Sequence, residues 1–367
     1  MSHVVMPPEL ESVIAGFDVP GRLVSAAPYG NGHINQTFVV AMAVGPATRR
    51  YIFQRINHRI FKNVPALMEN IRRVTAHMGQ KSPRSIALVS TRTGEPVLQH
   101  GAGTWWRVYD FIEGAHTVDQ VTTEHQAREA ARAFGEFQSQ LADIPGGRFH
   151  ETILNFHHTR RRFEDLRTAI TADCCNRAAS VRDEIAFSLA READTDVLVG
   201  LLARGEVQER VTHNDTKINN VMLDDVTGRG VAVIDLDTVM PGLALYDFGD
   251  MVRTSASSTA EDDPDPARME LKLPLFRAVV QGYLEAAGGV LNPTEKAHLG
   301  FAGKLMTFEV GIRFLADYLQ GDTYYKIKYR EHNLVRARTQ FALVRSIEQN
   351  EAAMARIVSE IANAGGA

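Results

Sequence analysis

The residues best suited to chemistry lie in the segment His213-Asn-Asp-Thr-Lys-Ile-Asn-Asn220 and shortly after it. Asp215 stands five positions before Asn220, and a short apolar run ends at Asp235. A carboxylate can accept a hydrogen bond from an attacking hydroxyl and orient it in line with a phosphorus atom. An amide oxygen and a second carboxylate are hard ligands of the kind that Mg²⁺ prefers. The spacing therefore predicts phosphoryl transfer, with Asp215 as base and with Asn220 and Asp235 as metal ligands.

This order of residues is the spacing of a kinase catalytic loop, in which His stands two positions before the Asp and Asn five positions after it. We interpret His213 as structural, holding a backbone carbonyl near the base. Lys217 either contacts the transferring phosphate or is solvated, and the sequence leaves both open. Asp237 follows Asp235 by two residues and could join or buffer the metal site.

A second tripeptide, Asp247-Phe-Gly249, has the letters of the metal-binding motif of protein kinases. No apolar strand leads into it, however, and a helical pattern follows it. We therefore predict a structural role for Asp247, which would cap a helix or brace the catalytic loop.

The first hundred residues contain short β-prone runs separated by Gly, Pro and Asn. This pattern predicts a five-stranded antiparallel sheet and one helix that begins near Asn63. The predicted strands cover 22–27, 36–42, 51–56, 86–89 and 105–109.

Helical spacing dominates the rest of the chain, interrupted by a β island at 210–212, 221–223 and 231–234. We expect 255–268, which is acidic and contains proline, to be an exposed loop. The prediction is an α+β, bilobal, protein-kinase-like fold. Its nucleotide-binding lobe of antiparallel sheet would cover 1–112, and its larger, mainly helical catalytic and substrate-binding lobe 113–367. The predicted helices cover 123–141, 159–170, 182–190, 274–287, 300–319 and 333–361.

Two sites in the small lobe are candidates for binding the nucleotide. A turn containing Gly30, Asn31 and Gly32 joins the first two strands and would offer backbone N–H groups to the phosphates. A cation on the third strand should reach the α- and β-phosphates, and Arg55 is the candidate, with Glu69 on the following helix as its partner. Strand alternation leaves open whether Gln54 or Arg55 faces the phosphates.

Composition excludes several other classes of protein. The net charge is −4 with both signs interspersed, so a role on nucleic acid is not expected. No apolar run approaches the length of a membrane span, and the N-terminus has no basic head followed by an apolar core. The two cysteines, Cys174 and Cys175, are neighbours without metal-ligand spacing. We expect a reduced, cytoplasmic protein that is a monomer or a weak homo-oligomer.

The chain resembles the aminoglycoside phosphotransferase and choline kinase group, and within it most of all the N-acetylhexosamine 1-kinases. Two motifs carry the resemblance, 211–222 (VTHNDTKINNVM) and 233–243 (VIDLDTVMPGL). The sugar assignment also draws on 308–319 (FEVGIRFLADYL) followed by 321–325 (GDTYY). The resemblance extends from the Gly30 turn to about Tyr325.

The resemblance implies an ATP- and Mg²⁺-dependent kinase that converts N-acetylglucosamine or N-acetylgalactosamine to the sugar 1-phosphate. It makes Asp110 and Ile112, within 109–112, part of a hinge that contacts adenine. It also places the sugar near Asp215, with Arg313 and Tyr324 as contacts and His33 closing over it. One departure concerns the third strand, where Gln54-Arg55 replaces the usual lysine.

Alternatives stay open at this point. Arg313 has helical spacing to Glu309 and Asp317, which also fits an ordinary ion pair. The acceptor could instead be choline, ethanolamine, homoserine, an aminoglycoside or methylthioribose. A nucleotide-binding protein without catalysis and a hydrolytic metal site at His213, Asp215 and Asp235 are the other two readings. The absence of a second histidine cluster weighs against the hydrolytic one.

Overall fold

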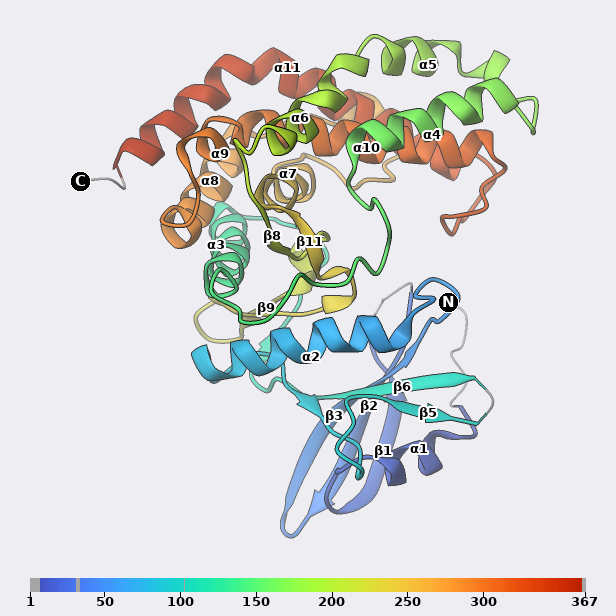
Figure 1. Ribbon diagram of the computed structural model, residues 1–367, viewed down its shortest axis with the longest axis vertical. Coiled ribbons are helices and arrows are strands. Elements are labelled where there is room, and N and C mark those ends of the chain that lie inside the picture. The colour runs from blue at the N-terminus through green and yellow to red at the C-terminus, as the bar shows by residue number, and fades with distance from the viewer. Residues whose placement is uncertain (1–6, 31–33, 102, 365–367) are drawn as a thin grey trace. The chain divides into compact units, whose positions relative to one another are not determined.

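The computed structural model describes residues 7–30, 34–101 and 103–364. The chain divides into two compact units, whose elements are labelled in Figure 1. The first unit comprises Met1–Ala115, Asp143–Ile153 and Ile234–Val239, and the second comprises His116–Ala142, Leu154–Val233 and Met240–Ala367. The sequence predicted a single division after residue 112. The observed units differ mainly in the two later segments, which belong to the first unit.

The first unit is built on an antiparallel sheet, drawn in blue to cyan in Figure 1. The strand order is β1-β2-β3-β6-β4, and β5 also pairs with β6. The predicted α+β class and antiparallel sheet are confirmed, while β5 and a short N-terminal helix, α1, were not predicted. The bounds are α1 Leu10–Gly16, β1 Arg22–Pro28, β2 Gln36–Val44, β3 Ala47–Ile56, α2 Val64–Lys81, β4 Leu88–Val89, β5 Leu98–His100 and β6 Thr104–Asp110.

The core of the first unit follows from the alternation of side chains along its strands. Phe38, Val40 and Met42 are buried at every second position of β2. Phe53 of β3 packs edge to face on Phe17, with ring centroids 5.8 Å apart. These side chains belong to one cluster that fixes the register, because a slip of one residue would expose them.

Helix α2 begins with a clear capping signal and buries one polar side chain. The side chain of Asn63 accepts a hydrogen bond from Ala66 N at 3.1 Å, and Pro65 occupies the first turn. Asn70 is fully buried and donates to His150 O at 2.8 Å and to Val239 O at 3.0 Å. One amide thus binds both later segments of the first unit.

The second unit is mainly helical, and each predicted helix corresponds to an observed one. Helix α3 begins after Thr123, whose side chain accepts from Gln126 N, as an N-cap residue should. The helices are α3 Glu124–Gln140, α4 Thr159–Ala172, α5 Arg182–Leu189, α6 Val197–Ala203, α7 Ala244–Ser255, α8 Leu273–Ala287, α9 Pro293–Ala297, α10 Leu299–Leu319 and α11 His332–Ala364. The 3₁₀ turns of this unit are η1 Ala178–Ser180, η2 Glu192–Asp196, η3 Ile218–Asn220 and η5 Pro266–Arg268.

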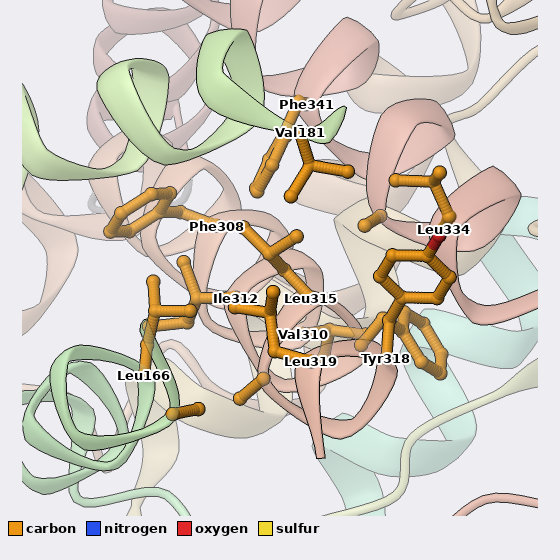
Figure 2. Close-up of a cluster of buried hydrophobic side chains, with 14 of the residues drawn as sticks. Leu166, Val181, Phe308, Val310, Ile312, Leu315, Tyr318, Leu319, Leu334 and Phe341 are labelled. Atoms are coloured by element: carbon orange, nitrogen blue, oxygen red, sulfur yellow. The ribbon is translucent and has the colours of Figure 1, made fainter. Parts of the chain in front are cut away.

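Helix α10 forms the centre of the second unit. Figure 2 shows its side chains Phe308, Ile312 and Leu315 within a buried cluster that α4 and α11 complete. Gly311 permits the close approach of α11, because a Cβ there would lie 2.7 Å from the ring of Phe341. Among the residues that the structure describes, every helix, α10 included, is too short or too polar to cross a lipid bilayer.

Two short strand pairs lie within the helical unit. β8 (Glu209–Thr212) pairs with β11 (Met240–Leu243), and β9 (Val221–Asp224) pairs with β10 (Gly230–Val233), both antiparallel. The sequence predicted all of these except β11. The segment 213–220 is therefore an excursion between two strand ends, β8 and β9. β7 (Ala115–His116) lies where the chain passes from one unit to the other.

The acidic segment 255–268 differs from its prediction. It is mostly half-buried instead of exposed, and Glu261, Asp262 and Asp263 within it form ion pairs. Glu261 binds Arg253, and Asp262 accepts from Lys328 at 2.6 Å. Charge alone predicts a solvated loop, whereas Arg253 stands eight positions before Glu261 and Lys328 comes from a segment 66 positions after Asp262.

Candidate active site

The predicted catalytic loop brings Asp215 and Asn220 together. The side-chain amide of Asn220 donates to Asp215 O at 2.8 Å and to its carboxylate Oδ2 at 3.1 Å. Lys217 Nζ lies 3.0 Å from the same Oδ2. The turn η3, at the end of the loop, creates these contacts between residues close in sequence. The loop thus presents one carboxylate that is oriented by an amide and an ammonium group.

The charge of Asp215 suits a group that accepts a hydrogen bond from a hydroxyl. Burial raises the pKa of this carboxyl, but the positive charges of Lys217, His213 and Arg253 and the hydrogen bond from Lys217 lower it below its usual value overall. Asp215 is therefore ionised at neutral pH, the state that a base in phosphoryl transfer requires.

Two carboxylates of α7 hold the backbone of the catalytic loop. Asp247 accepts from His213 N at 2.9 Å and from Asn214 N at 2.7 Å, and Asp250 accepts from Thr216 N at 2.8 Å. The predicted structural role of Asp247 is confirmed. Asp250 was missed, although it lies one helical turn further along the same face of α7.

The remaining backbone of the loop is shaped by a left-handed residue and a buried ring. Asn214 has φ 64°, a conformation that Asn adopts more readily than most residues. His213 is fully buried and packs edge to face on Phe134 and Phe137, with centroids 5.3 and 5.7 Å away. This surrounding agrees with a structural role for His213.

A cavity of about 130 Å³ lies between α4, α10 and the segment that follows α10. Arg313 and Tyr324, the predicted sugar contacts, both line it. Arg162 lines it as well, and this residue was not predicted. Arg162 donates through Nε to Phe156 O at 2.9 Å, and its nearest carboxylate, Asp165, is 3.6 Å away. The full lining is Arg162, Asp165, Arg313, Ala316, Asp317, Gln320, Tyr324 and Tyr325.

The two tyrosines of this cavity are held by one buried carboxylate, Asp317. Its oxygens accept from the backbone N–H groups of Thr323, Tyr324 and Tyr325 at 2.9, 2.8 and 3.0 Å. Asn333 Nδ2 donates to it as well, at 2.9 Å. Asp317 therefore fixes the turn after α10, and its capacity as an acceptor is already used.

Arg313 is connected to the catalytic loop through buried polar groups. Its Nη1 lies 3.5 Å from Glu309 Oε1, and that oxygen is 2.7 Å from His157 Nδ1. His157 Nε2 is 3.0 Å from the carbonyl oxygen of Asn214, the residue before Asp215. Three contacts thus join the cavity to the loop that carries the predicted base.

The other predicted metal ligand, Asp235, belongs to the first unit. It is an exposed residue with φ 59°, in the left-handed region, and it begins the turn η4 (Leu236–Thr238). Asp237 in that turn is buried and forms an ion pair with Arg107. It also accepts from Asn35 Nδ2 at 2.5 Å. Asp237 therefore anchors the turn that presents Asp235.

Arg107 of β6 is the buried cation that the sequence interpretation missed. Its guanidinium is fully buried, and its Nε donates to Gln54 Oε1 at 2.9 Å. Burial lowers the pKa of Arg107, but the charge of Asp237 raises it above the usual value overall, so the group stays charged. A charged residue within the apolar run 105–109 was the available signal.

The predicted pairing of Arg55 with Glu69 is not present. Arg55 points to the face of the sheet opposite to Gln54, where it lies 3.8 Å from Glu9 and 3.4 Å from Gln36. Glu69 accepts from His150 at 2.8 Å. The physical reason is periodicity, because α2 turns Asn70 inward and leaves Glu69 on its half-exposed side.

The other predicted nucleotide contacts lie at the edges of the sheet. Gly30 has φ 74°, which favours glycine, whereas Asn31, Gly32 and His33 lie outside the described residues. Asp110 ends β6 and donates its N–H to Ala87 O at 3.0 Å. Burial raises the pKa of its carboxyl, and Arg49 opposes this. Ile112 follows two residues later.

Comparison with known proteins places the chain in a family. The model of the phosphotransferase enzyme family matches residues 25–287, which is most of the chain. The protein therefore belongs to the phosphotransferase enzyme family.

Solved structures with the same fold cover nearly the whole chain at low sequence identity. Amicoumacin kinase hAmiN in complex with AMP-PNP, Ca²⁺ and Ami has a TM-score of 0.59 and 14% identity over 92% of this chain and 93% of that one. A microcompartment-associated aminopropanol kinase has a TM-score of 0.56 and 16% identity over 94% and 98%. The choline kinase from Cryptosporidium parvum Iowa II has a TM-score of 0.52 and 14% identity over 90% and 91%. These likenesses confirm the kinase-like fold.

Proposed function

We propose that the protein transfers the γ-phosphoryl group of ATP, with Mg²⁺, to the anomeric hydroxyl of an N-acetylhexosamine and releases the sugar 1-phosphate. Asp215 is the base in this proposal. It accepts a hydrogen bond from the attacking hydroxyl and takes up its proton, a role supported by its ionised state and by the amide that orients it.

Asn220 and Asp235 are the proposed ligands of Mg²⁺, and their chemistry fits this ion. The Nδ2 group of Asn220 is committed to Asp215, so its Oδ1 is directed to the other side of the amide. Asp235 contributes an exposed carboxylate at the start of a turn that Arg107 and Asp237 anchor. Both supply hard oxygen atoms, as Mg²⁺ requires. When bound, the ion would neutralise phosphate charge.

The remaining proposed contacts with ATP come from the turn at Gly30, Asn31 and Gly32, from the hinge at Asp110 and Ile112, and from Lys217. One solved structure of this fold holds AMP-PNP, and this supports ATP as the phosphoryl donor. Arg55 and Glu69 are bound to other partners. The buried cation of this region is Arg107, which pairs with Asp237 and so orders the segment that contains Asp235.

The observation that carries the choice of acceptor is the excess of hydrogen-bond donors in the cavity. Arg162 and Arg313 bring two guanidinium groups into it. Of its two carboxylates, Asp317 is saturated by backbone N–H groups, and Asp165 lies at the exposed rim, 3.6 Å from Arg162. Such a cavity favours an acceptor with many oxygens, including an amide carbonyl, and opposes an ammonium group. Choline or an aminoglycoside would bring positive charge next to both arginines. Arg313 and Tyr324, with His33, are the proposed sugar contacts.

The test is a set of acceptors assayed with Mg-ATP: N-acetylglucosamine, N-acetylgalactosamine, glucose, choline, ethanolamine, homoserine and kanamycin. Phosphorus NMR of the product would read the position of the phosphate. We expect turnover of the N-acetylhexosamines, with the phosphate on the anomeric oxygen, and none of the amines. Faster turnover of choline or kanamycin than of either sugar would contradict the proposal.

A further inference from the structure

Glu309 and His157 form a buried, hydrogen-bonded pair that the proposed phosphoryl transfer does not use. Glu309 is fully buried in α10, and His157, in the segment before α4, is 8% exposed. The ring of His157 forms two hydrogen bonds, one between Nδ1 and Glu309 Oε1 at 2.7 Å and one between Nε2 and the carbonyl oxygen of Asn214 at 3.0 Å. Removing a charge and a ring from water is unfavourable, so a pair in this position needs a reason.

The hydrogen bonds define how the ring must be protonated. A backbone carbonyl only accepts, so Nε2 carries a hydrogen atom. Burial raises the pKa of Glu309, but the charge and hydrogen bond of His157, together with Arg313 and Arg162, lower it below its usual value overall. An ionised carboxylate also only accepts, so both bonds are satisfied together when His157 is an imidazolium. The ring then links Glu309 to the catalytic loop through two donated bonds.

The second oxygen of Glu309 is unsatisfied. Among the described residues, Glu309 Oε2 is a buried oxygen atom that receives no hydrogen bond. Arg313 lies next to this carboxylate, with Nη1 3.5 Å from Oε1, which is longer than a charged hydrogen bond. A small shift of the guanidinium would satisfy both oxygens in a bidentate pair. A ligand that contacts the cavity side of Arg313 could hold the guanidinium in that position.

We propose that Glu309 and His157 are positioning residues that connect occupancy of the Arg313 cavity to the backbone of the catalytic loop. An acceptor that holds Arg313 completes its pair with Glu309. The pair fixes His157, and His157 fixes Asn214 O next to the base, Asp215. This inference rests on the proposed function, because it takes the cavity to be the acceptor site.

The experiment compares Glu309→Gln and His157→Gln with the wild type in two assays. One assay follows transfer to N-acetylglucosamine, and the other follows hydrolysis of Mg-ATP by water, which needs no sugar. We expect kcat to fall by about 10- to 100-fold in both, because a displaced base lowers the rate steeply. The KM for ATP should change by less than about twofold, since nucleotide contacts are untouched.

A double variant distinguishes a connected chain from independent residues. Arg313→Met should lower the kcat of sugar transfer through the same chain, and it should leave hydrolysis near the wild-type rate because no acceptor then holds Arg313. If the chain acts as one unit, Arg313→Met with Glu309→Gln should be no slower than the slower single variant. If the fold decrease in kcat of the double variant equals the product of the two single decreases, the residues act independently and the connection is contradicted.

Glu295→Gln is the matched control for loss of a buried carboxylate. Glu295 is 1% exposed and pairs with Arg210 at 3.0 Å, so its removal affects stability similarly. Its kcat per folded molecule should equal that of the wild type. Hydrogen exchange of the peptide 213–220 gives a test without substrate, and we expect faster exchange in Glu309→Gln and His157→Gln only.

The outcomes separate the two proposals. Wild-type exchange and wild-type hydrolysis per folded Glu309→Gln molecule would overturn the positioning role, whatever the acceptor. A second outcome is that Glu309→Gln hydrolyses ATP more slowly than the wild type, while the wild type itself makes no sugar phosphate. This outcome would support the positioning role and overturn the N-acetylhexosamine assignment.

Discussion

The loop at 213–220 and the β3–α2 region predicted to bind phosphate differ in how well their sequence predicted their contacts. In the loop, Asp215 and Asn220 meet as their spacing indicates. In the other region, Arg55 and Glu69, which were expected to meet, bind Glu9 and His150 instead. Both regions contain charged residues in a kinase-like order. They differ in how far apart in the sequence the two expected partners stand.

A contact between residues five positions apart is fixed by one short turn, which local sequence determines. A contact between a strand and a helix depends on which face each side chain occupies, and a shift of one residue reverses it. Gln54 and Asn70 face inward, one position away from the two residues that were predicted. The charged pair of this region is instead formed by Arg107 and Asp237, which are far apart in sequence.

The largest expected effect tests the loop. Asp215→Asn should lower kcat by about 10²- to 10⁴-fold, the usual contribution of a general base, and leave the KM for ATP nearly unchanged. Steady-state kinetics with saturating acceptor measure both. Asp225→Asn is the control, because it removes an exposed carboxylate just after β9 that pairs with His116. Wild-type turnover in Asp215→Asn would remove this residue from the mechanism.

The next prediction compares the two arginines of the first unit. Arg107→Met leaves Asp237 buried without its cation, and we expect a loss of about 3 to 5 kcal/mol in the free energy of unfolding. Arg55→Met removes a loose pair at the surface and should change that free energy by about 1 kcal/mol or less. Urea unfolding followed by circular dichroism measures both. A tenfold higher KM for ATP in Arg55→Met would restore the predicted phosphate contact.

The sequence predicted those parts of the molecule that depend on local pattern. The helices α3, α4, α8, α10 and α11, the strands of the sheet other than β5, the loop motif and the structural role of Asp247 all follow from short-range spacing and capping residues. Two segments, 143–153 and 234–239, could not be assigned to the first unit in this way. Their place depends on the buried amide of Asn70, whose partners lie 80 and 169 positions away.

The residues missed in the second unit have the same explanation. Arg162 reaches the cavity from α4, and Glu309 and His157 meet across 152 positions. Each of these residues alone looks like an ordinary surface charge in the sequence. Only the packing of α4 against α10 removes them from water and turns them into parts of a site.

The pH dependence tests the brace of the loop. Burial raises the pKa of Asp247 to about 6, although His213 and two backbone N–H groups oppose it. Between about pH 4 and 6 the folded state therefore holds a proton that the unfolded state has lost, so this group's contribution to stability falls as the pH rises. The ionised carboxylate accepts both N–H groups, so we expect kcat to rise as the pH increases through about 6.

Unfolding in urea and kcat, each measured from pH 4.5 to 7.5, check both directions. Asp247→Asn should lack the step in both curves. Since the pKa of Asp215 is lowered, that residue should not titrate in this range. A flat kcat profile between pH 5 and 7 would contradict the assignment of the step to Asp247.

A smaller effect is expected at the turn after α10. Asp317→Asn weakens the bonds to the N–H groups of Thr323, Tyr324 and Tyr325, so the side chain of Tyr324 is held less firmly. We expect the KM for the acceptor to rise about tenfold, which corresponds to about 1.4 kcal/mol, at unchanged KM for ATP. Asp165→Asn, at the exposed rim of the same cavity, is the control and should have a smaller effect. An equal rise in both variants would show that charge alone matters.

The smallest expected effect concerns Glu69. Its bond to His150 lies between two half-exposed side chains, so Glu69→Gln should leave the unfolding midpoint and the KM for ATP unchanged. Asn70→Ala, one position away, removes the three hydrogen bonds of a fully buried side chain and should destabilise the first unit clearly. Urea unfolding and ATP kinetics on both variants measure this contrast. A tenfold rise in the KM for ATP in Glu69→Gln would mean that Glu69 exchanges His150 for a cation when nucleotide binds, and helix periodicity would then be a poor guide to this region.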